Sequence, residues 1–251
     1  MNYKEYAEKE CLRWQQKMLK SPNILGRSAK NIQTKINKKI PQQIHTIITE
    51  SIKKMIQAVI LGSKWTSRKA PLEHMTLSER EDKIRARIKI YKRLAAIEGA
   101  GTGAGGFWLG FADFPALISI KMKLLFDIAT LYGYDVKDYR ERLYILYIFQ
   151  VAFSSDSKRK EAFRKLKHWD NTIKDFPSAS THLQQLDWQS LQQEYRDYID
   201  LPKLLQMLPG IGAAVGFVVN YHFLDNLGDT AMNAYRMRLL DMTKNKKKMR
   251  E

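Results

Sequence analysis

The sequence has very little cysteine and no apolar leader segment. Cys11 is the single cysteine among 251 residues, which excludes an internal disulfide framework and a CxxC zinc or redox motif. The first fourteen residues, MNYKEYAEKECLRW, carry charges throughout and contain no apolar core or small-residue cleavage site. We therefore expect no secretory signal and a protein that stays in the reducing cytoplasm.

The motifs of the common metal-binding and catalytic classes are also missing. The five histidines are scattered without HExxH or HxxxH spacing, and no GxSxG sequence is present, so we predict no metal site and find no positive sign of catalysis. Residues 101–106 match GxGxxG, but a helix is predicted before them where a dinucleotide fold needs a strand. No GK[ST] follows either, and we predict no cofactor.

Acidic residues are few relative to basic ones. The chain has 43 Lys and Arg against 26 Asp and Glu, a net charge of +17, and residues 1–70 contribute 15 minus 4, or +11. This excess predicts an anionic lipid surface, a membrane transporter subunit or nucleic acid as partner. Nucleic acid ranks below the other two because no helix-turn-helix, zinc-finger or RNP motif is visible. The predicted contacts with an anionic surface are Arg27, Lys30, Lys35, Lys38, Lys39, Lys53 and Lys54.

Strand-like alternation is absent, and apolar residues recur at helical spacing along most of the chain. The clearest apolar stripe covers residues 44–60 and ends before Gly62. Thr76 and Glu79 form a TxxE capping box that predicts the start of a charged helix, and residues 94–97 are expected to carry that helix toward the core. Gly133 is expected to end a helix that begins near residue 113. A further helix is predicted over roughly 138–153, buried on most sides.

These patterns predict an all-α protein with a single multi-helix domain over residues 1–251. Its composition divides as follows: basic amphipathic helices at 1–70, a first glycine-rich helical half at 76–153, a polar helical connector at 154–203, a second glycine-rich half at 204–242, and a basic tail at 243–251, expected to be solvated and frayed.

Two uncharged segments, 99–112 and 204–224, are rich in small residues. Helical spacing would place their glycines on one face of each helix, where the missing side chains allow another helix to approach closely. We therefore predict that the two helices form a central, closely packed pair. The second segment is long enough to span a bilayer, but its polar residues and proline make insertion marginal. The predicted packing glycines are Gly99, Gly103, Gly106, Gly110, Gly212 and Gly216.

Four polar residues flank or follow the glycine-rich segments and could form one polar seam. Asp113 is also a natural helix N-cap, with Pro115 in the first turn after it. The seam has two open interpretations: structural capping and ion pairing, or an apolar pocket of a lipid-binding protein or hydrolytic enzyme. The seam residues are Asp113, Asn220, Asp225 and Arg236.

The order of these motifs resembles the EcsC family of bacterial proteins. The resemblance lies in GAGTGAGGFWLGFADFPALISI, then ATLYGYD, then LPGIGAAVGFVVNYHFLDNLGDTAMNAYRMRLL, and the N-terminal KINKKIPQQIHTIITESIKKMI is similar to members from Bacillus-type bacteria. It implies no established activity or ligand. In some bacilli, family members are encoded beside the ATPase and membrane subunits of an ABC exporter. Together with the charge asymmetry, the absent signal peptide and the two uncharged glycine segments, this predicts a non-catalytic accessory or adaptor protein, peripheral at the inner membrane face and linked to an ABC transporter. Nucleic-acid binding through residues 24–54 is the weaker alternative.

Overall fold

The computed structural model describes residues 2–20, 42–62, 74–103, 114–176, 191, 193, 199 and 213–248. Within these ranges the backbone is helical, and β pairing is limited to an isolated bridge between Ser154 and Ile199. The predicted all-α fold class is therefore confirmed. The helices are α1 (Tyr3–Leu19), α3 (Gln42–Leu61), α4 (Leu77–Gly103), α6 (Phe114–Tyr132), α7 (Tyr139–Phe153), α8 (Asp156–Lys167), α9 (Trp169–Thr172), the 3₁₀ helix η1 (Ile173–Asp175) and α12 (Ala213–Lys248).

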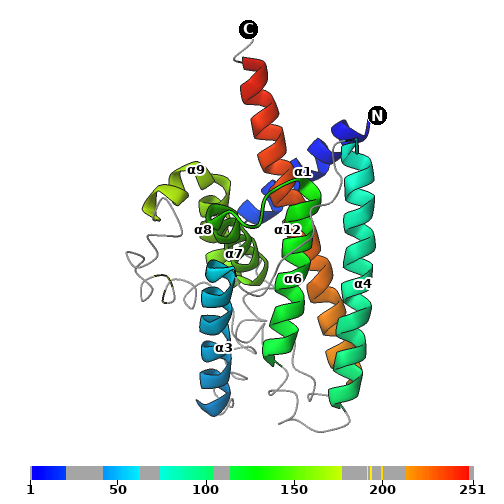
Figure 1. Cartoon of the computed structure of the whole chain (residues 1–251), viewed down its shortest axis with the longest axis vertical. Helices are drawn as coiled ribbons and strands as arrows, with labels where there is room; N and C mark the ends of the chain where they lie inside the picture. Colours follow the sequence, from blue (N-terminus) through cyan, green and yellow to red (C-terminus); the bar gives the residue numbers. More distant parts are fainter. Residues whose placement is uncertain are drawn as a thin grey trace.

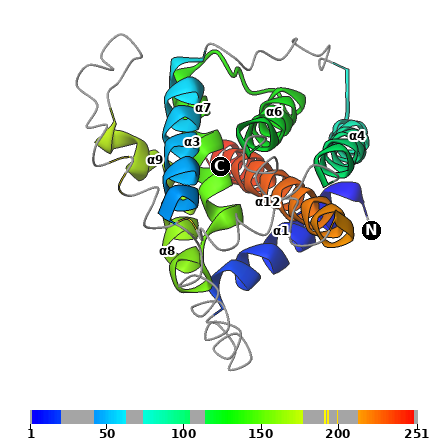
Figure 2. The same cartoon turned by 90° about the horizontal axis from the view of Figure 1, so that it is seen from below.

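The long helix α12 organises the bundle. It runs antiparallel to α4, and α6 packs against both of them. On its other side α12 contacts α7, which in turn packs against α3 and α8 (Figure 1). The N-terminal helix α1 crosses the bundle and contacts α12, α8 and α4 (Figure 2). As a result α4 lies at one edge of the molecule, whereas α8 lies on the other side of α12.

The predicted helix ends are confirmed where the structure describes them. The Thr76 amide donates to Glu79 Oε2 at 2.7 Å, and the Glu79 amide donates to Thr76 Oγ1 at 3.3 Å, which completes the capping box of α4. Gly62 and Gly133 end α3 and α6 with φ of 71° and 95°. Such left-handed backbone is strained for residues with a Cβ, so glycine suits both positions. Asp138 caps α7 through its side chain.

The apolar stripe of α3 faces the protein core. Ile48, Ile56, Val59 and Ile60 are fully buried, and Met55 is nearly so. Burial of this stripe stabilises the fold by removing apolar area from water, so the stripe is not available for insertion into a bilayer. Helix α7 is buried along almost its whole length, as predicted.

The two helices that carry the glycine-rich segments do pack together. The ion pairs Glu81–Arg236 and Lys92–Asp225 set the antiparallel register of α4 and α12. This register brings the C-terminal turns of α4, with Gly99 and Gly103, level with the N-terminal turns of α12, with Gly216. Contact between these particular glycines stays a prediction. The other three predicted packing glycines, Gly106, Gly110 and Gly212, lie outside the described residues.

A close glycine contact occurs at a position that the sequence analysis passed over. A Cβ built on Gly228 of α12 would lie 2.5 Å from Cδ1 and 2.9 Å from Cγ1 of Ile88 on α4. Both distances are shorter than carbon atoms tolerate, so a side chain at Gly228 would force the Ile88 side chain to move from its present position. Gly228 lies outside both small-residue runs, which explains why the composition did not mark it.

Two expectations about helix extent and direction are corrected. The basic tail is helical as far as Lys248, because lysine is a good helix former and the packed part of α12 supplies a nucleus for it to extend. Leu94 does not turn toward the core: it is 46% exposed, whereas its neighbour Ala95 is buried.

In the described part of the chain, none of the helices is long and apolar enough to cross a membrane.

Candidate functional site

A buried carboxylate lies on the inner face of α4, where this helix meets α12. Glu81 occupies the same helical face as Ile84, Ile88 and Ala95, at spacings of three, four and seven residues. The Glu81 side chain is 0% exposed. A charged group so deeply buried requires hydrogen-bond partners and a counterion.

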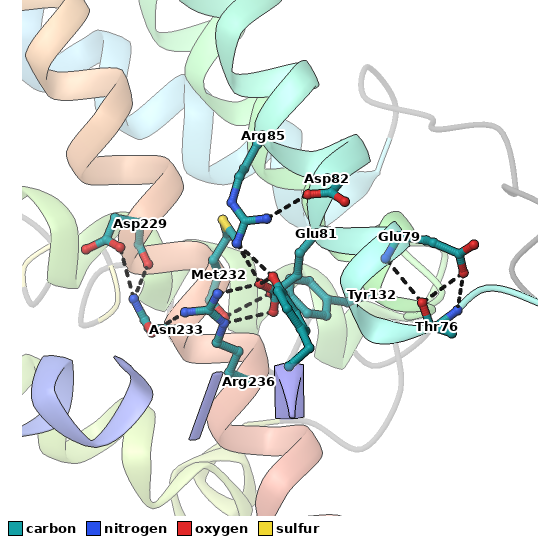
Figure 3. Close-up of polar contacts among 11 residues, drawn as sticks. Thr76, Glu79, Glu81, Asp82, Arg85, Tyr132, Asp229, Met232, Asn233 and Arg236 are labelled. Atoms are coloured by element: carbon teal, nitrogen blue, oxygen red, sulfur yellow. Dashed lines mark hydrogen bonds and ion pairs between the residues drawn. The ribbon is translucent and has the colours of Figure 1, made fainter. Parts of the chain in front are cut away.

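Four side chains from four helices supply those partners (Figure 3). Arg236 of α12 donates from Nε to Glu81 Oε1 at 2.8 Å and from Nη2 to Oε2, forming a bidentate ion pair. The hydroxyls of Tyr132 on α6 and Tyr3 on α1 donate to Oε1 and Oε2 at 3.0 and 2.6 Å. Arg85 Nη2 adds a contact of 3.2 Å to Oε2. Glu81 therefore connects α1, α4, α6 and α12.

These partners hold Glu81 in its ionised form. Burial by itself raises the pKa of Glu81, but the hydrogen bonds and charge of Arg236, with the hydroxyls of Tyr3 and Tyr132, outweigh burial and leave that pKa lowered. Burial also lowers the pKa of Arg236, and the carboxylate of Glu81 more than offsets this effect. The pKa of Tyr132 is raised well above its ordinary value by burial and by the charge of Glu81.

Further hydrogen bonds extend from the two arginines to neighbouring polar side chains. Arg236 Nη1 donates to Asn233 Oδ1 at 3.1 Å, and Asn233 Nδ2 donates to Asp229 Oδ1 at 3.1 Å (Figure 3). Arg85 Nη1 donates to Asp82 Oδ1 at 2.9 Å at the protein surface. The network thus extends from the core to solvent along α4 and along α12.

A second ion pair, with a buried carboxylate and a half-buried guanidinium, lies close to the first along α12. Glu141 of α7 accepts from Arg238 Nη1 at 2.7 Å and from the Tyr235 hydroxyl at 2.6 Å. The Arg238 guanidinium lies over the rings of Tyr134 and Tyr144, 4.1 and 4.3 Å from their centroids. Burial raises the pKa of Glu141, and the opposing charge of Arg238 does not fully cancel that rise.

An aromatic cluster joins the two ion pairs. The Tyr235 ring stacks on Tyr132 at 5.3 Å between centroids and contacts Tyr134 at 5.0 Å and Tyr144 at 5.5 Å. We call Glu81, Arg236, Tyr132, Tyr235, Glu141 and Arg238 the buried clamp. Residues 235–238 of α12 therefore fix this helix to α4, α6 and α7 at a single level of the bundle.

The chemistry of the buried clamp favours positioning over proton transfer. Glu81 accepts from five nitrogen or oxygen atoms, so it could take up a proton only by giving up several charge-assisted hydrogen bonds. Apart from Arg85, which lies on the same helix, its partners come from helices far apart in sequence, and each of these contacts restrains the position of one helix relative to another. Among the described residues, no group of three or more His, Cys, Asp or Glu side chains is arranged to hold a metal ion.

The structure separates the predicted seam residues that it describes. Arg236 belongs to the buried clamp, whereas Asp225 pairs with Lys92. Both face α4, but eleven residues of helix separate them by about 16 Å, and each pairs with a different residue of α4. The four-residue seam itself stays a prediction. Asp113 and the side chain of Asn220 lie outside the described residues.

The predicted anionic-surface residues are only partly covered by the structure. Lys54 is exposed on α3 and Lys53 is partly exposed. The other five, at positions 27–39, lie outside the described residues. The two lysines flank a buried apolar stripe, so any contact they make with an anion would be electrostatic.

Sequence reasoning missed both buried carboxylates. Glu81 carried a usable signal, because it interrupts the apolar spacing of its helix on the face that points inward. Glu141 carried a similar one, since it begins a helix that is otherwise mostly apolar and aromatic. Neither signal indicates which arginine would pair with the acid.

The chain is similar to known proteins over nearly its full length. The sequence model of the EcsC protein family matches residues 5–240, a range that holds every residue of the buried clamp. Protein EcsC of Bacillus subtilis (strain 168) is 45% identical over 234 residues, 93% of this chain and 95% of that protein. Uncharacterized protein YdbA of the same organism is 31% identical over 192 residues, 76% of this chain and 67% of that protein. No solved structure matches.

Proposed function

The chain belongs to the EcsC protein family, and from this we propose that it is an accessory or adaptor protein that binds the inner face of the plasma membrane beside an ABC transporter. The setting beside a transporter is what the family resemblance implies. Attachment to the membrane surface is argued from charge.

The observation that carries the proposal is the uncompensated positive charge of the chain. The net charge is +17, and cationic side chains are exposed on α1, including Lys9 and Lys17, and at Lys20 just after it. Each Lys or Arg close to an anionic leaflet contributes about 1 kcal/mol of binding free energy. Several cations acting together are enough for reversible attachment without a spanning helix.

The buried clamp suits such a role. Two ion pairs of the clamp join α12 to α4 and to α7, and the Tyr132 hydroxyl joins α6 to Glu81. A body held in this way presents its surface charges in a fixed arrangement, so binding requires little ordering of the protein. An adaptor that contacts both a membrane and a protein partner benefits from that rigidity.

Vesicle flotation tests the lipid part of the proposal. The chain should float with vesicles that contain phosphatidylglycerol and remain at the bottom of the gradient with pure phosphatidylcholine. High salt should release it, because added ions screen exposed charges. No flotation with anionic vesicles at low salt would eliminate the lipid part.

Cell fractionation and crosslinking test the remainder. The protein should sediment with membranes and be released by a high-salt or carbonate wash, as peripheral proteins are. In intact cells, crosslinking should join it to an ABC transporter subunit. Recovery in the soluble fraction alone, with no crosslink to a transporter, would contradict the adaptor role.

A further inference from the structure

The outer face of α4 differs from an ordinary solvated helix surface. Ile90 and Leu94 are each 46% exposed and lie one turn apart on α4, outside the buried face that Ile88 and Ala95 share. Water-exposed aliphatic side chains at successive turns form a small apolar ridge. Helix α4, which carries these two residues, lies at one edge of the molecule (Figures 1 and 2).

Cations surround this ridge. Lys83, Arg87, Lys89 and Arg93 are all exposed along the same helix. Arg87, Lys89 and Arg93 form no ion pair with an acidic side chain of the described residues, and Asp82, the nearest exposed acid on this helix, is already paired with Arg85. The outer face of α4 therefore carries net positive charge around two aliphatic side chains.

We propose that this surface is the part of the protein that contacts anionic lipid; the inference rests on the membrane attachment proposed above. We call the surface the α4 ridge, and it consists of Lys83, Arg87, Lys89, Ile90, Arg93 and Leu94. A bilayer interface offers both complements at once, since acyl chains accept aliphatic side chains and anionic headgroups accept Lys and Arg. Nucleic acid phosphates would bind the cations, but nucleic acid offers Ile90 and Leu94 no apolar contact like that of acyl chains. The ridge also carries no aromatic side chain that could stack on bases.

The inner face of the same helix keeps the α4 ridge in place. Glu81 binds Arg236, Ile88 packs against Gly228, and Lys92 pairs with Asp225. These contacts span the stretch that carries the exposed cations. The ridge is thus already helical and fixed before binding, so attachment does not need to order it.

Two variants test the ridge by vesicle flotation and by titration with vesicles of phosphatidylglycerol and phosphatidylcholine. Arg87→Glu with Arg93→Glu removes two cations and adds two anions, and it should weaken partitioning by at least about 30-fold, from roughly fivefold for each cation lost. Ile90→Ser with Leu94→Ser leaves the charge unchanged and should weaken partitioning about tenfold, because the apolar contact is lost.

Each variant has a matched control on another helix. Arg164→Glu with Lys167→Glu makes the same charge change at exposed sites on α8, on the other side of the molecule. Leu12→Ser with Leu61→Ser removes two exposed leucines from α1 and α3. Both controls should retain binding within about threefold of the wild type, since a localised contact does not extend to α8 or to these leucines. Circular dichroism confirms that all four proteins are folded.

The outcomes separate this inference from the proposed function. If both ridge variants lose binding and both controls keep it, the α4 ridge is the contact. If the wild type binds but the ridge variants bind as well as their controls, the α4 ridge is not the lipid contact, although membrane attachment itself is supported. If the wild type binds no anionic vesicle, both fail. If the serine variant alone binds normally, or a nucleic acid binds the wild type more tightly than vesicles do, lipid is not the partner of the ridge.

Discussion

Replacing Glu81 by glutamine removes one charge from the centre of the bundle and changes the side-chain volume very little. Arg236, which is 5% exposed, would then be buried without its counterion. The new amide group would also point NH₂ hydrogens at donors that now face a carboxylate. Breaking a buried pair from one side costs about 3–5 kcal/mol, a large part of the roughly 5–15 kcal/mol that stabilises a domain.

The expected result is a fall in melting temperature of about 6–20 °C, at about 2–4 °C per kcal/mol for a chain of this size. Circular dichroism at 222 nm during heating, and urea unfolding at 25 °C, both measure it. The matched control is Asp82→Asn, the same chemical change one residue along. Because Asp82 is 70% exposed and pairs at the surface, its loss should cost at most about 1 kcal/mol.

The pH dependence supplies an independent check. The pKa of folded Glu81 is lowered relative to an ordinary value of about 4.3, so its contribution to stability is present above that value and is lost as pH falls through the folded pKa. The stability gap between wild type and Glu81→Gln should therefore narrow below about pH 4. Equal stabilities of Glu81→Gln and Asp82→Asn at neutral pH would refute the reasoning.

Three further changes test the packing. Gly228→Val should lower the free energy of unfolding by about 1–3 kcal/mol, because its Cβ would lie 2.5 Å from Ile88 Cδ1. In a double-mutant cycle measured by urea unfolding, adding Ile88→Ala to Gly228→Val should recover part of that loss. Tyr139→Phe should leave stability unchanged or raise it by up to about 1 kcal/mol, because the buried hydroxyl has no hydrogen-bond partner among the described residues. Burial also raises the pKa of Tyr139 to about 12. Thermal melts of the wild type and the variant measure the difference in stability. Arg142→Met should cost about 1.5–3 kcal/mol and speed hydrogen exchange in the last turn of α3, because the guanidinium donates to the Ile60 carbonyl at 3.1 and 2.9 Å.

Local features of the fold could be predicted because their causes lie within a few residues. The capping box of Thr76 and Glu79, the left-handed glycines at the ends of α3 and α6, and the buried stripe of α3 all follow from short-range spacing. Leu94 was misplaced because apolar character alone does not reveal which face of a helix looks inward. Its position depends on where α6 and α12 pack.

The candidate site could be predicted only in fragments. Arg236 was selected as a polar residue, but it was grouped with Asp225 on one supposed seam. Their shared helical face was real, since both residues point toward α4. What the spacing could not show is that each finds a different partner there, Glu81 for one and Lys92 for the other.

The sequence by itself determined that this chain is helical, where several of its helices begin and end, how strongly basic it is, and which family it resembles. Tertiary structure alone decided that Glu81 meets Arg236, 155 residues away, and that Gly228 makes room for Ile88. The physical reason is that such pairs depend on the register between α4 and α12. That register is set by the combined packing of many side chains from several helices, and no local pattern of residues records it.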